Sequence, residues 1–437
     1  MKSPLKIAFL TLGCKLNYAE TSTYERKLLS SGVQLEAVPW NEGADIYLVN
    51  TCSVTEHSDK KCRNIIRKLH RQSPEAAIFV TGCYAQLKRP EIEAIEGVRR
   101  VFGAKEKNLV VPEIASYISS ATALSAEDGA VQGGDFFGAY STGERTRSFL
   151  KVQDGCDFKC AYCTVPYARG ESRNEPIAAI VSKAEEIAAT GCREIVLTGV
   201  NTGDFGKTTG ESFFQLIREL NEVEGIERYR ISSIEPNLLT EEMVLWLADG
   251  TKFLPHFHIP LQSGCDEILH QMGRRYDTAA FASKLELIRR AFAPRKVFFG
   301  IDVIVGFPGE TEEHFTQTYN FLANVAQPSF IHVFPYSRRA GTPAALRKDQ
   351  VQDSIKSERV ARLEQLSARL HREFIESCLG NSAEVLIESR TKDGMMAGYT
   401  ENYIRVQCPE GEIGKCTRTV LDRHNTGLDK DLKEPEE

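Results

Sequence analysis

Residues 156–163 read Cys156-Asp157-Phe158-Lys159-Cys160-Ala161-Tyr162-Cys163, so three cysteines share one short loop in a C-x3-C-x2-C spacing. A strand-like run at 149–153 and a turn at Asp154-Gly155 precede the loop. Cysteine thiolates are the usual ligands of iron–sulfur clusters, and three of them hold three irons of a 4Fe–4S cube. The fourth iron is then open to a small molecule, as in a catalytic site rather than a closed structural one.

Structural zinc is the alternative for this loop. Zinc-binding cysteines usually come as two separated C-x2-C pairs, and the loop contains one such pair, Cys160 and Cys163. The spacing therefore favours an iron–sulfur cluster and leaves zinc as the second interpretation.

Strand-like and helix-like segments alternate from residue 149 to about 337. Strands are predicted at 149–153, 194–198, 228–233, 256–261, 297–305 and 330–336. Helices are predicted at 176–190, 213–221, 240–248, 266–271, 278–293 and 311–324. Six strand–helix units predict a partial (β/α)6 barrel with its active-site loops at the carboxyl ends of the strands. The Cys156 loop follows the first strand and belongs to that edge.

The N-terminal residues predict a separate open parallel α/β sheet. Strands are expected at 5–10, 44–50, 77–81 and 100–102, with helices at 17–31, 57–71 and 90–95. Cys14, Cys52 and Cys83 follow the first three strands. Open α/β sheets bind ligands at the carboxyl ends of their strands, so these cysteines predict a second three-cysteine cluster. The alternative is ordinary core packing, since free cysteine often behaves as a small hydrophobe. Cys62 lies inside a predicted helix and is interpreted as a bystander.

The C-terminal residues predict a small β module. An amphipathic helix is expected at 354–379, because Leu363, Leu366, Leu370 and Phe374 recur at helical spacing. Strands at 383–388, 403–406 and 415–420 follow and indicate a β-barrel-like unit. A loop-like boundary at 119–146 separates the first two parts.

Composition restricts the class of protein. The formal net charge is -6, so any nucleic-acid contact must come from local patches. The chain has twelve cysteines, and we expect neither a leader peptide nor a membrane span. Unpaired cysteines in a reducing compartment more often indicate metal binding or catalysis than disulfides. We therefore expect a cytoplasmic metalloprotein.

Further motifs extend along the whole chain. They are Gly13-Cys14-Lys15-Leu16-Asn17, Asn50-Thr51-Cys52-Ser53-Val54-Thr55, Thr81-Gly82-Cys83-Tyr84-Ala85-Gln86, Val165-Pro166, Arg169-Gly170, Ser172-Arg173, Pro260-Leu261-Gln262-Ser263-Gly264 and Met272-Gly273-Arg274-Arg275-Tyr276. Together with the cysteine loop they resemble the radical S-adenosylmethionine (SAM) methylthiotransferases. Residues 398–406 are similar to the TRAM domain of that family. The resemblance implies a cluster domain at 1–118, a radical SAM core at 142–373 and a TRAM-like domain at 376–437.

The resemblance also implies roles for individual residues. Cys156, Cys160 and Cys163 would hold the 4Fe–4S cluster that cleaves SAM, and Cys14, Cys52 and Cys83 would hold an auxiliary 4Fe–4S cluster that carries the transferred sulfur. Contacts to SAM are expected from Tyr162, Thr198, Gly199, Ser233, Glu235, Gln262, Arg169 and Arg173. Contacts to substrate are expected from Asn17, Arg274, Tyr276 and Arg405.

The opening Gly13-Cys14-Lys15 resembles the subfamily that acts on N6-threonylcarbamoyladenosine (t6A) beside the tRNA anticodon. The expected partners are tRNA, SAM and an electron-donor protein, with no membrane. Three alternatives remain open at this point: methylthiolation of isopentenyl-adenosine in tRNA, methylthiolation of a ribosomal-protein aspartate, and a non-enzymatic iron–sulfur electron carrier.

Overall fold

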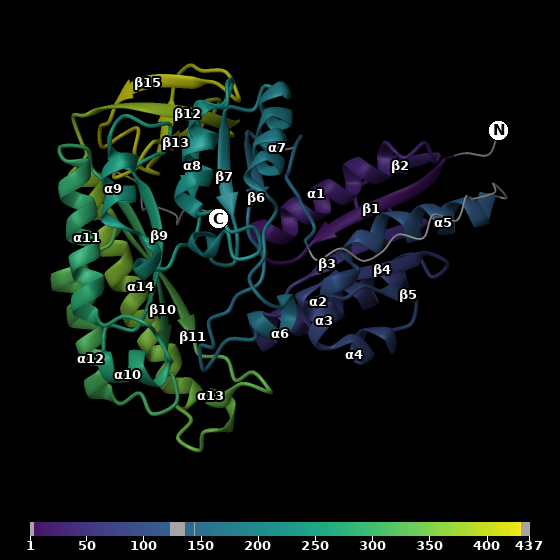
Figure 1. Cartoon of the computed structure of the whole chain (residues 1–437), viewed down its shortest axis with the longest axis horizontal. Helices are drawn as coiled ribbons and strands as arrows, with labels where there is room; N and C mark the ends of the chain where they lie inside the picture. Colours follow the sequence, from purple (N-terminus) through teal and green to yellow (C-terminus); the bar gives the residue numbers. More distant parts are fainter. Residues whose placement is uncertain (1–3, 123–135, 144, 430–437) are drawn as a thin grey trace.

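The computed structural model describes residues 4–122, 136–143 and 145–429. These residues form an N-terminal sheet with helices, a curved central sheet with helices outside it, and a small C-terminal sheet (Figure 1). The arrangement confirms the predicted fold class. Most of the predicted boundary at 119–146 lies outside the described residues.

The N-terminal part is a five-stranded parallel sheet with the order β2-β1-β3-β4-β5. Its strands are β1 (Leu5–Thr11), β2 (Leu35–Ala37), β3 (Ile46–Thr51), β4 (Ala77–Gly82) and β5 (Val98–Val101). Every residue of β3 and β4 is buried, as expected for central strands of a parallel sheet. Strand β2 was not predicted, because this edge strand is three residues long and mostly exposed.

Helices cover both faces of this sheet. They are α1 (Lys15–Leu29), α2 (Glu56–Gln72), α3 (Cys83–Leu87), α4 (Arg89–Glu93), the 3-10 helix η1 (Ala104–Leu109) and α5 (Val110–Thr122). Apolar residues of α1 and α5 pack on one face, and those of α2, α3 and α4 pack on the other. Helix α5 was not predicted, although Val110, Ile114 and Ile118 recur every four residues and are all buried.

The central part contains six parallel strands. They are β6 (Arg147–Lys151), β7 (Glu194–Thr198), β8 (Arg228–Ile231), β9 (His256–Gln262), β10 (Phe298–Val305) and β11 (Phe330–Pro335). Two three-stranded sheets, β6-β7-β8 and β9-β10-β11, are joined by a parallel bridge between Ser233 and His258. The strands thus follow one another in chain order, which confirms the partial barrel.

The helices of the central part alternate with its strands. They are α6 (Val165–Arg169), α7 (Ile177–Ala189), η2 (Thr202–Asp204), α8 (Phe213–Glu222), η3 (Pro236–Leu238), α9 (Glu241–Ala248), α10 (Asp266–Gln271), α11 (Thr278–Phe292), α12 (Glu312–Phe321), η4 (Leu322–Ala326) and α13 (Pro343–Leu346). Side chains of Ser212, Thr240, Asp277 and Thr311 accept backbone N–H groups at the starts of α8, α9, α11 and α12. Such caps satisfy donors that a helix leaves unpaired.

Helix α14 (Asp353–Glu376) confirms the predicted amphipathic helix and packs Leu363, Leu366 and Leu370 into the barrel core. The C-terminal strands β12 (Ser382–Arg390), β13 (Met396–Thr400), β14 (Arg405–Cys408) and β15 (Cys416–Val420) form an antiparallel sheet with the order β14-β13-β12-β15. Strand β13 was not predicted. Arg230 of β8 donates to the carbonyl oxygens of Thr400 and Glu401, which fastens this sheet to the barrel.

No helix in the described ranges is long and apolar enough to cross a membrane.

Candidate active site

The strand order of the N-terminal sheet explains why three distant cysteines meet. In an open sheet with the order 2-1-3-4-5, ligands bind where the order reverses, between β1 and β3. Cys14 follows β1, Cys52 follows β3 and Cys83 begins α3 directly after β4. The sheet topology therefore gathers the N-terminal triad, defined as Cys14, Cys52 and Cys83, at one edge.

Two glycines allow this close approach. Gly13 and Gly82 have φ of +121° and +101°, a region that side chains disfavour. A Cβ on Gly13 would lie 2.7 Å from Cβ of Cys52, and one on Gly82 would lie 2.2 Å from the carbonyl oxygen of Thr51. A glycine is required before Cys14 and before Cys83 for this geometric reason.

The thiols of the N-terminal triad affect one another. Burial and the nearby Cys83 and Cys14 together raise the pKa of Cys52 to about 12. Burial also raises the pKa of Cys83, while Arg169 lowers it. A metal bound by these thiols would have to displace their protons, so its loading would depend on pH. Cys62 is buried and its Sγ lies 3.4 Å from the carbonyl oxygen of Cys52, to which it donates, in keeping with a packing role.

The second group of cysteines, the loop triad, consists of Cys156, Cys160 and Cys163. The backbone N–H groups of Phe158 and Val165 donate to the sulfurs of Cys156 and Cys163, each at 3.4 Å. Burial raises the pKa of these two thiols, to about 11 for Cys156 and about 12 for Cys163, although the N–H groups act in the lowering direction. Donors aimed at sulfur stabilise the thiolate form that binds metal.

Arg274 anchors the loop triad to the barrel. Its guanidinium donates to Sγ of Cys160 at 3.3 Å and to the hydroxyl of Tyr162 at 3.4 Å. It also binds the carboxylate of Glu235 and the hydroxyl of Tyr276. The backbone N–H of Ala161 donates to the carbonyl oxygen of Met272 at 2.9 Å. Arg274 therefore positions Cys160, Tyr162 and Glu235 together.

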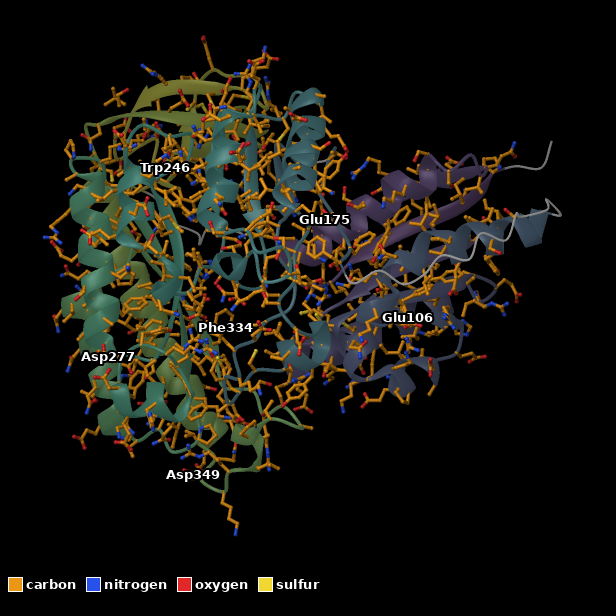
Figure 2. All side chains as sticks on the ribbon, in the orientation of Figure 1. Glu106, Glu175, Trp246, Asp277, Phe334 and Asp349 are labelled. Atoms are coloured by element: carbon orange, nitrogen blue, oxygen red, sulfur yellow. The ribbon has the colours of Figure 1, made fainter. Side chains whose placement is uncertain are left out.

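One cavity of about 370 Å³ joins the two cysteine groups. All three cysteines of the loop triad line it, and so does Cys83 of the N-terminal triad. Phe334, which also lines it, lies between the barrel and the N-terminal part (Figure 2). We call this space the main cavity. Its volume lies within the range of small-molecule sites.

A buried charge network lies beside the N-terminal triad. Among the described residues, four cations contact two carboxylates: Lys107, Lys151, Arg169 and Arg173 surround Glu20 and Asp154. Four minus two leaves an excess of two positive charges, and buried charges are costly unless paired. Cys83 and Cys14 lie close enough to Arg169 to raise its pKa. A cluster held by three thiolates is anionic, so it would fit this surplus.

The structure brings some predicted residues together and separates others. The predicted SAM contacts Tyr162, Ser233, Glu235 and Gln262 line the main cavity, as does the predicted substrate contact Arg274. Gln262 adopts a φ of +70°, which is unusual for a residue other than glycine. Thr198 and Gly199 lie at the end of β7, just outside the lining.

The remaining predicted residues are committed to other contacts. Arg169 binds Asp154, Glu20 and Asn17, and Arg173 binds Asp154 and backbone carbonyls, so these guanidinium groups face the charge network. Asn17 is fully buried, and its amide nitrogen donates to the carbonyl oxygens of Leu12 and Thr51. The hydroxyl of Tyr276 donates to the carbonyl oxygen of Leu261. Arg405 is an exposed residue of β14.

Neither cysteine triad has the spacing of a single-metal site. In the described ranges, one group of three potential ligands has all its ligand atoms within 4.8 Å of one another: His258, Asp302 and His332. Thiolates around one zinc ion lie about 3.8 Å apart, given Zn–S bonds of about 2.3 Å. The wider cysteine spacing fits a multi-iron cluster and disfavours structural zinc.

Several further residues, for which no individual contact was predicted, also line the main cavity. They are Ser53, Val54, Thr55, Asn201, Asp302 and Arg339. Arg339 donates to Ser53 at 2.6 Å and binds Asp59 at 2.9 Å, so it links the loop after β11 to the loop after β3. The available signal was their position just after a strand or, for Asp302, within one.

Comparisons with known proteins agree with this geometry. The Radical SAM superfamily matches residues 150–322, and Uncharacterized protein family UPF0004 matches residues 6–103. The radical SAM methyltransferase TsrM from Kitasatospora setae has a similar fold, with a TM-score of 0.55 and 15% identity over 78% of this chain and 77% of that one. Fold and site therefore define a radical SAM enzyme, a class that uses a 4Fe–4S cluster and SAM.

Curated relatives show to which family of radical SAM enzymes the chain is similar. The threonylcarbamoyladenosine tRNA methylthiotransferase MtaB of Bacillus subtilis (strain 168) is 39% identical over 425 residues, which cover 95% of this chain and 93% of the relative. A tRNA-2-methylthio-N(6)-dimethylallyladenosine synthase of Carboxydothermus hydrogenoformans is 32% identical over 417 residues, 90% of each chain. The chain belongs to the radical SAM methylthiotransferase family.

Proposed function

We propose that this enzyme replaces the C2 hydrogen of N6-threonylcarbamoyladenosine by a methylthio group, next to the tRNA anticodon at position 37. The observation that carries the proposal is the main cavity, which Cys83 of one triad and all three cysteines of the other line together. A radical source and a sulfur source must act on the same base, so they must face the same space.

The choice of t6A rests on the relatives. Methylthiotransferases named for threonylcarbamoyladenosine match at 39% and 34% identity over 95% of the chain, against 32% for the dimethylallyladenosine enzyme. A base in an anticodon loop is unpaired or easily splayed, so it can enter a cavity inside a protein.

Two metal groups would be held by the chain. Cys156, Cys160 and Cys163 would hold one 4Fe–4S cluster, and Cys14, Cys52 and Cys83 a second. When bound, the first supplies the electron that cleaves SAM and the second supplies the sulfur that is transferred. The surplus of buried positive charge around Arg169 supports the second cluster, because an anionic group there would complete the charge balance.

Side chains of the main cavity would bind and orient SAM and would shield the reactive radical from water. Tyr162, Ser233, Glu235 and Gln262 surround the loop triad and would hold SAM. Arg274 keeps Glu235 and Tyr162 in place through its hydrogen bonds. Phe158, Phe334 and Ile304 supply apolar walls that limit the access of water to a reactive radical.

The domain limits 1–118, 142–373 and 376–437, the cytoplasmic location and the protein electron donor remain predictions. A TRAM-like role for the C-terminal sheet is part of the same proposal.

The test is mass spectrometry of nucleosides after the reconstituted enzyme, SAM and a reductant act on anticodon stem-loop RNA. We expect 2-methylthio-t6A from RNA that carries t6A and little product from RNA that carries isopentenyl-adenosine. Product from the isopentenyl RNA alone, or from a ribosomal-protein substrate alone, would contradict the proposal. Reversible one-electron cycling without SAM turnover would indicate an electron carrier instead.

A further inference from the structure

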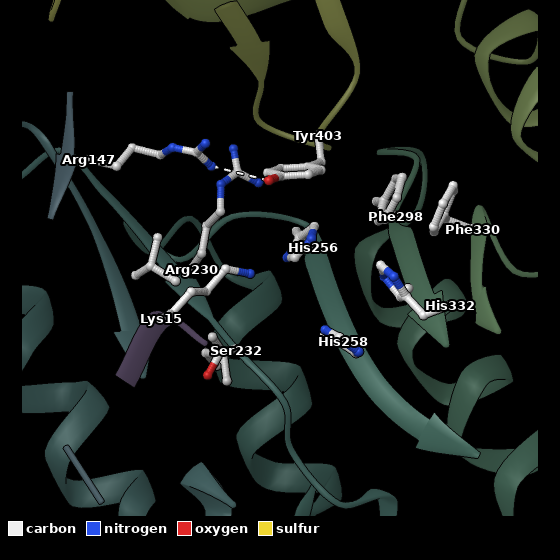
Figure 3. Close-up of a pocket in the computed structure, with 13 residues that line it drawn as sticks. Lys15, Arg147, Arg230, Ser232, His256, His258, Phe298, Phe330, His332 and Tyr403 are labelled. Carbon is white, nitrogen blue, oxygen red and sulfur yellow. Dashed lines mark hydrogen bonds between the residues drawn. The ribbon is translucent and has the colours of Figure 1, made fainter. Parts of the chain in front are cut away.

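A small cationic cavity lies inside the barrel, beside the main cavity. It is lined by Lys15 at the start of α1, Arg147 of β6, Arg230 of β8 and a ring of His256, His258, His332, Phe298, Phe330 and Tyr403 (Figure 3). Its volume of about 30 Å³ is enough for about two water molecules. A carboxylate has this size, whereas a whole nucleoside does not.

The charged groups that line the small cavity are all cationic. Arg147 binds Glu388 at 2.6 Å, and Arg230 binds Glu194 at 2.7 Å and donates to two backbone carbonyls. Lys15 differs from both, because its ammonium has no hydrogen bond or ion pair with any described residue. Its side chain extends from α1 into the cavity (Figure 3). A half-buried ammonium of this kind is a ready donor for an anion.

The electrostatics of the small cavity favour an anion over a metal cation. Burial, Arg230, His258 and Lys15 hold the pKa of His256 well below its usual value. Three carboxylates contact lining residues, and each is already paired: Asp302 with His258, Glu388 with Arg147 and Glu194 with Arg230. Although His258, Asp302 and His332 have the spacing of a metal site, the neighbouring Lys15 and Arg230 would repel a cation there.

The small cavity and the main cavity share a boundary. Asp302 lines the main cavity, and its partner His258 lines the small one. Ser233 and Ser232, adjacent in the chain, likewise line one cavity each. The small cavity therefore adjoins the main cavity at the His258–Asp302 pair.

We propose that the small cavity binds the carboxylate of the threonylcarbamoyl group, with Lys15 as its donor and Arg147 and Arg230 supplying positive potential. The inference rests on the proposed function and names the feature of t6A that the enzyme reads. A dimethylallyl substituent has no charge, so it would leave the ammonium unpaired in this space. Lys15 lies next to Cys14, and recognition of the substituent thus involves the part of the chain that holds the N-terminal triad.

The experiment compares Lys15→Gln with wild type on three anticodon stem-loop RNAs, which carry t6A, the methyl ester of t6A and isopentenyl-adenosine. Equilibrium binding by fluorescence anisotropy is measured beside KM for RNA and KM for SAM. Lys105→Gln is the matched control, because Lys105 is an exposed lysine of the same N-terminal part. Lys15→Arg tests rescue by another cation. Iron content and SAM cleavage without RNA show whether each variant is intact.

We expect Lys15→Gln to weaken binding of t6A RNA and raise its KM by about 10-fold or more, since one charge-assisted hydrogen bond is lost. The ester RNA should bind wild type and variant equally, and Lys15→Arg should recover most of the affinity. An equal loss for t6A and ester RNA would identify a phosphate contact, and a raised KM for SAM alone would identify a cofactor contact. Either result overturns this inference while the proposed function stands. Failure of wild type to modify t6A RNA would overturn the proposed function itself.

Discussion

The two cysteine triads adjoin the same cavity but are assembled from the chain in different ways. Cys156, Cys160 and Cys163 come from one loop of eight residues after β6, whereas Cys14, Cys52 and Cys83 come from the ends of three strands. Their surroundings differ as well. The loop triad is anchored by Arg274, which is paired with Glu235, while the N-terminal triad adjoins a network with two surplus cations.

Each environment suits the role proposed for its triad. A loop triad inside the barrel, surrounded by polar residues at the strand ends, suits a cluster that must bind an exchangeable cofactor. A triad fixed by the sheet and balanced by buried cations suits a cluster that is permanently anionic. The comparison predicts that the two sites fail in different ways when they are altered.

The largest effect is expected from Cys156→Ala. Loss of one ligand of the loop triad should lower SAM cleavage by at least about 1000-fold, because no other group supplies the electron. The measurement is release of 5′-deoxyadenosine by chromatography. Cys192→Ala is the control, since Cys192 lies outside both triads and bonds the carbonyl oxygen of Glu194. Cleavage near the wild-type rate in Cys156→Ala would remove the loop triad from catalysis.

Cys83→Ala should separate SAM cleavage from methylthiolation. SAM cleavage should stay within about threefold of wild type, because the loop triad is untouched, while the methylthiolated nucleoside falls to background. Both are measured in one reaction, by chromatography and mass spectrometry. Methylthio product formed by Cys83→Ala would show that the N-terminal triad is not the sulfur source.

Neutralising a buried carboxylate should destabilise the protein far more at the N-terminal site than at the loop triad. Although burial alone would raise it, Lys107, Lys151 and Arg169 hold the pKa of Glu20 well below 4.5. Glu20→Gln should therefore destabilise the protein by about 3 kcal/mol at neutral pH. Burial raises the pKa of Glu235 despite Arg274, so Glu235→Gln should cost less than about 1 kcal/mol.

The pH dependence of that pair follows from the signs of the shifts. Ionised Glu20 stabilises the fold above its unfolded pKa of 4.5, and this contribution is lost as the pH falls below that value. The difference between wild type and Glu20→Gln in urea unfolding should thus shrink in acid. For Glu235, with a raised pKa, the contribution is present in acid and lost as the pH rises. An equal loss of unfolding free energy in Glu20→Gln and Glu235→Gln at neutral pH would contradict this predicted difference between the two sites.

A smaller effect on SAM cleavage than that of Cys156→Ala is expected from Arg274→Lys. Lysine keeps the charge but cannot reach Cys160, Tyr162, Glu235 and Tyr276 together, because it lacks the planar fork of arginine. SAM cleavage should fall by about 10-fold with iron content unchanged. Tyr276→Phe removes only one partner of Arg274, so it should lower the rate of SAM cleavage by less than Arg274→Lys does. An unchanged rate in Arg274→Lys would assign Arg274 a purely structural role.

The sequence predicted the loop triad more directly than the rest of the site. Its ligands are neighbours in the chain, so spacing alone indicated the chemistry. The N-terminal triad could be predicted only together with a fold. The parallel strands before Cys52 and Cys83 were recognisable because β3 and β4 each begin with four apolar residues. The short edge strand β2 and the middle strand β13 of the C-terminal sheet were missed.

Side-chain partners could not be inferred in the same way. Arg169 and Arg173 were expected near SAM, yet they bind Asp154, which neighbours them only through the fold. Asn17 was expected at the substrate, yet it joins the loops after β1 and β3. Lys15 stood within a recognised motif, but its direction into the barrel depends on how α1 packs against β6.

The most direct test of the two-triad account is the iron and sulfide content of the anaerobically reconstituted protein, measured for wild type and for two variants in which each triad is replaced by alanine. The account predicts about eight irons per chain in wild type and about four in each variant. Four irons in wild type, with none lost when Cys14, Cys52 and Cys83 are replaced, would contradict it.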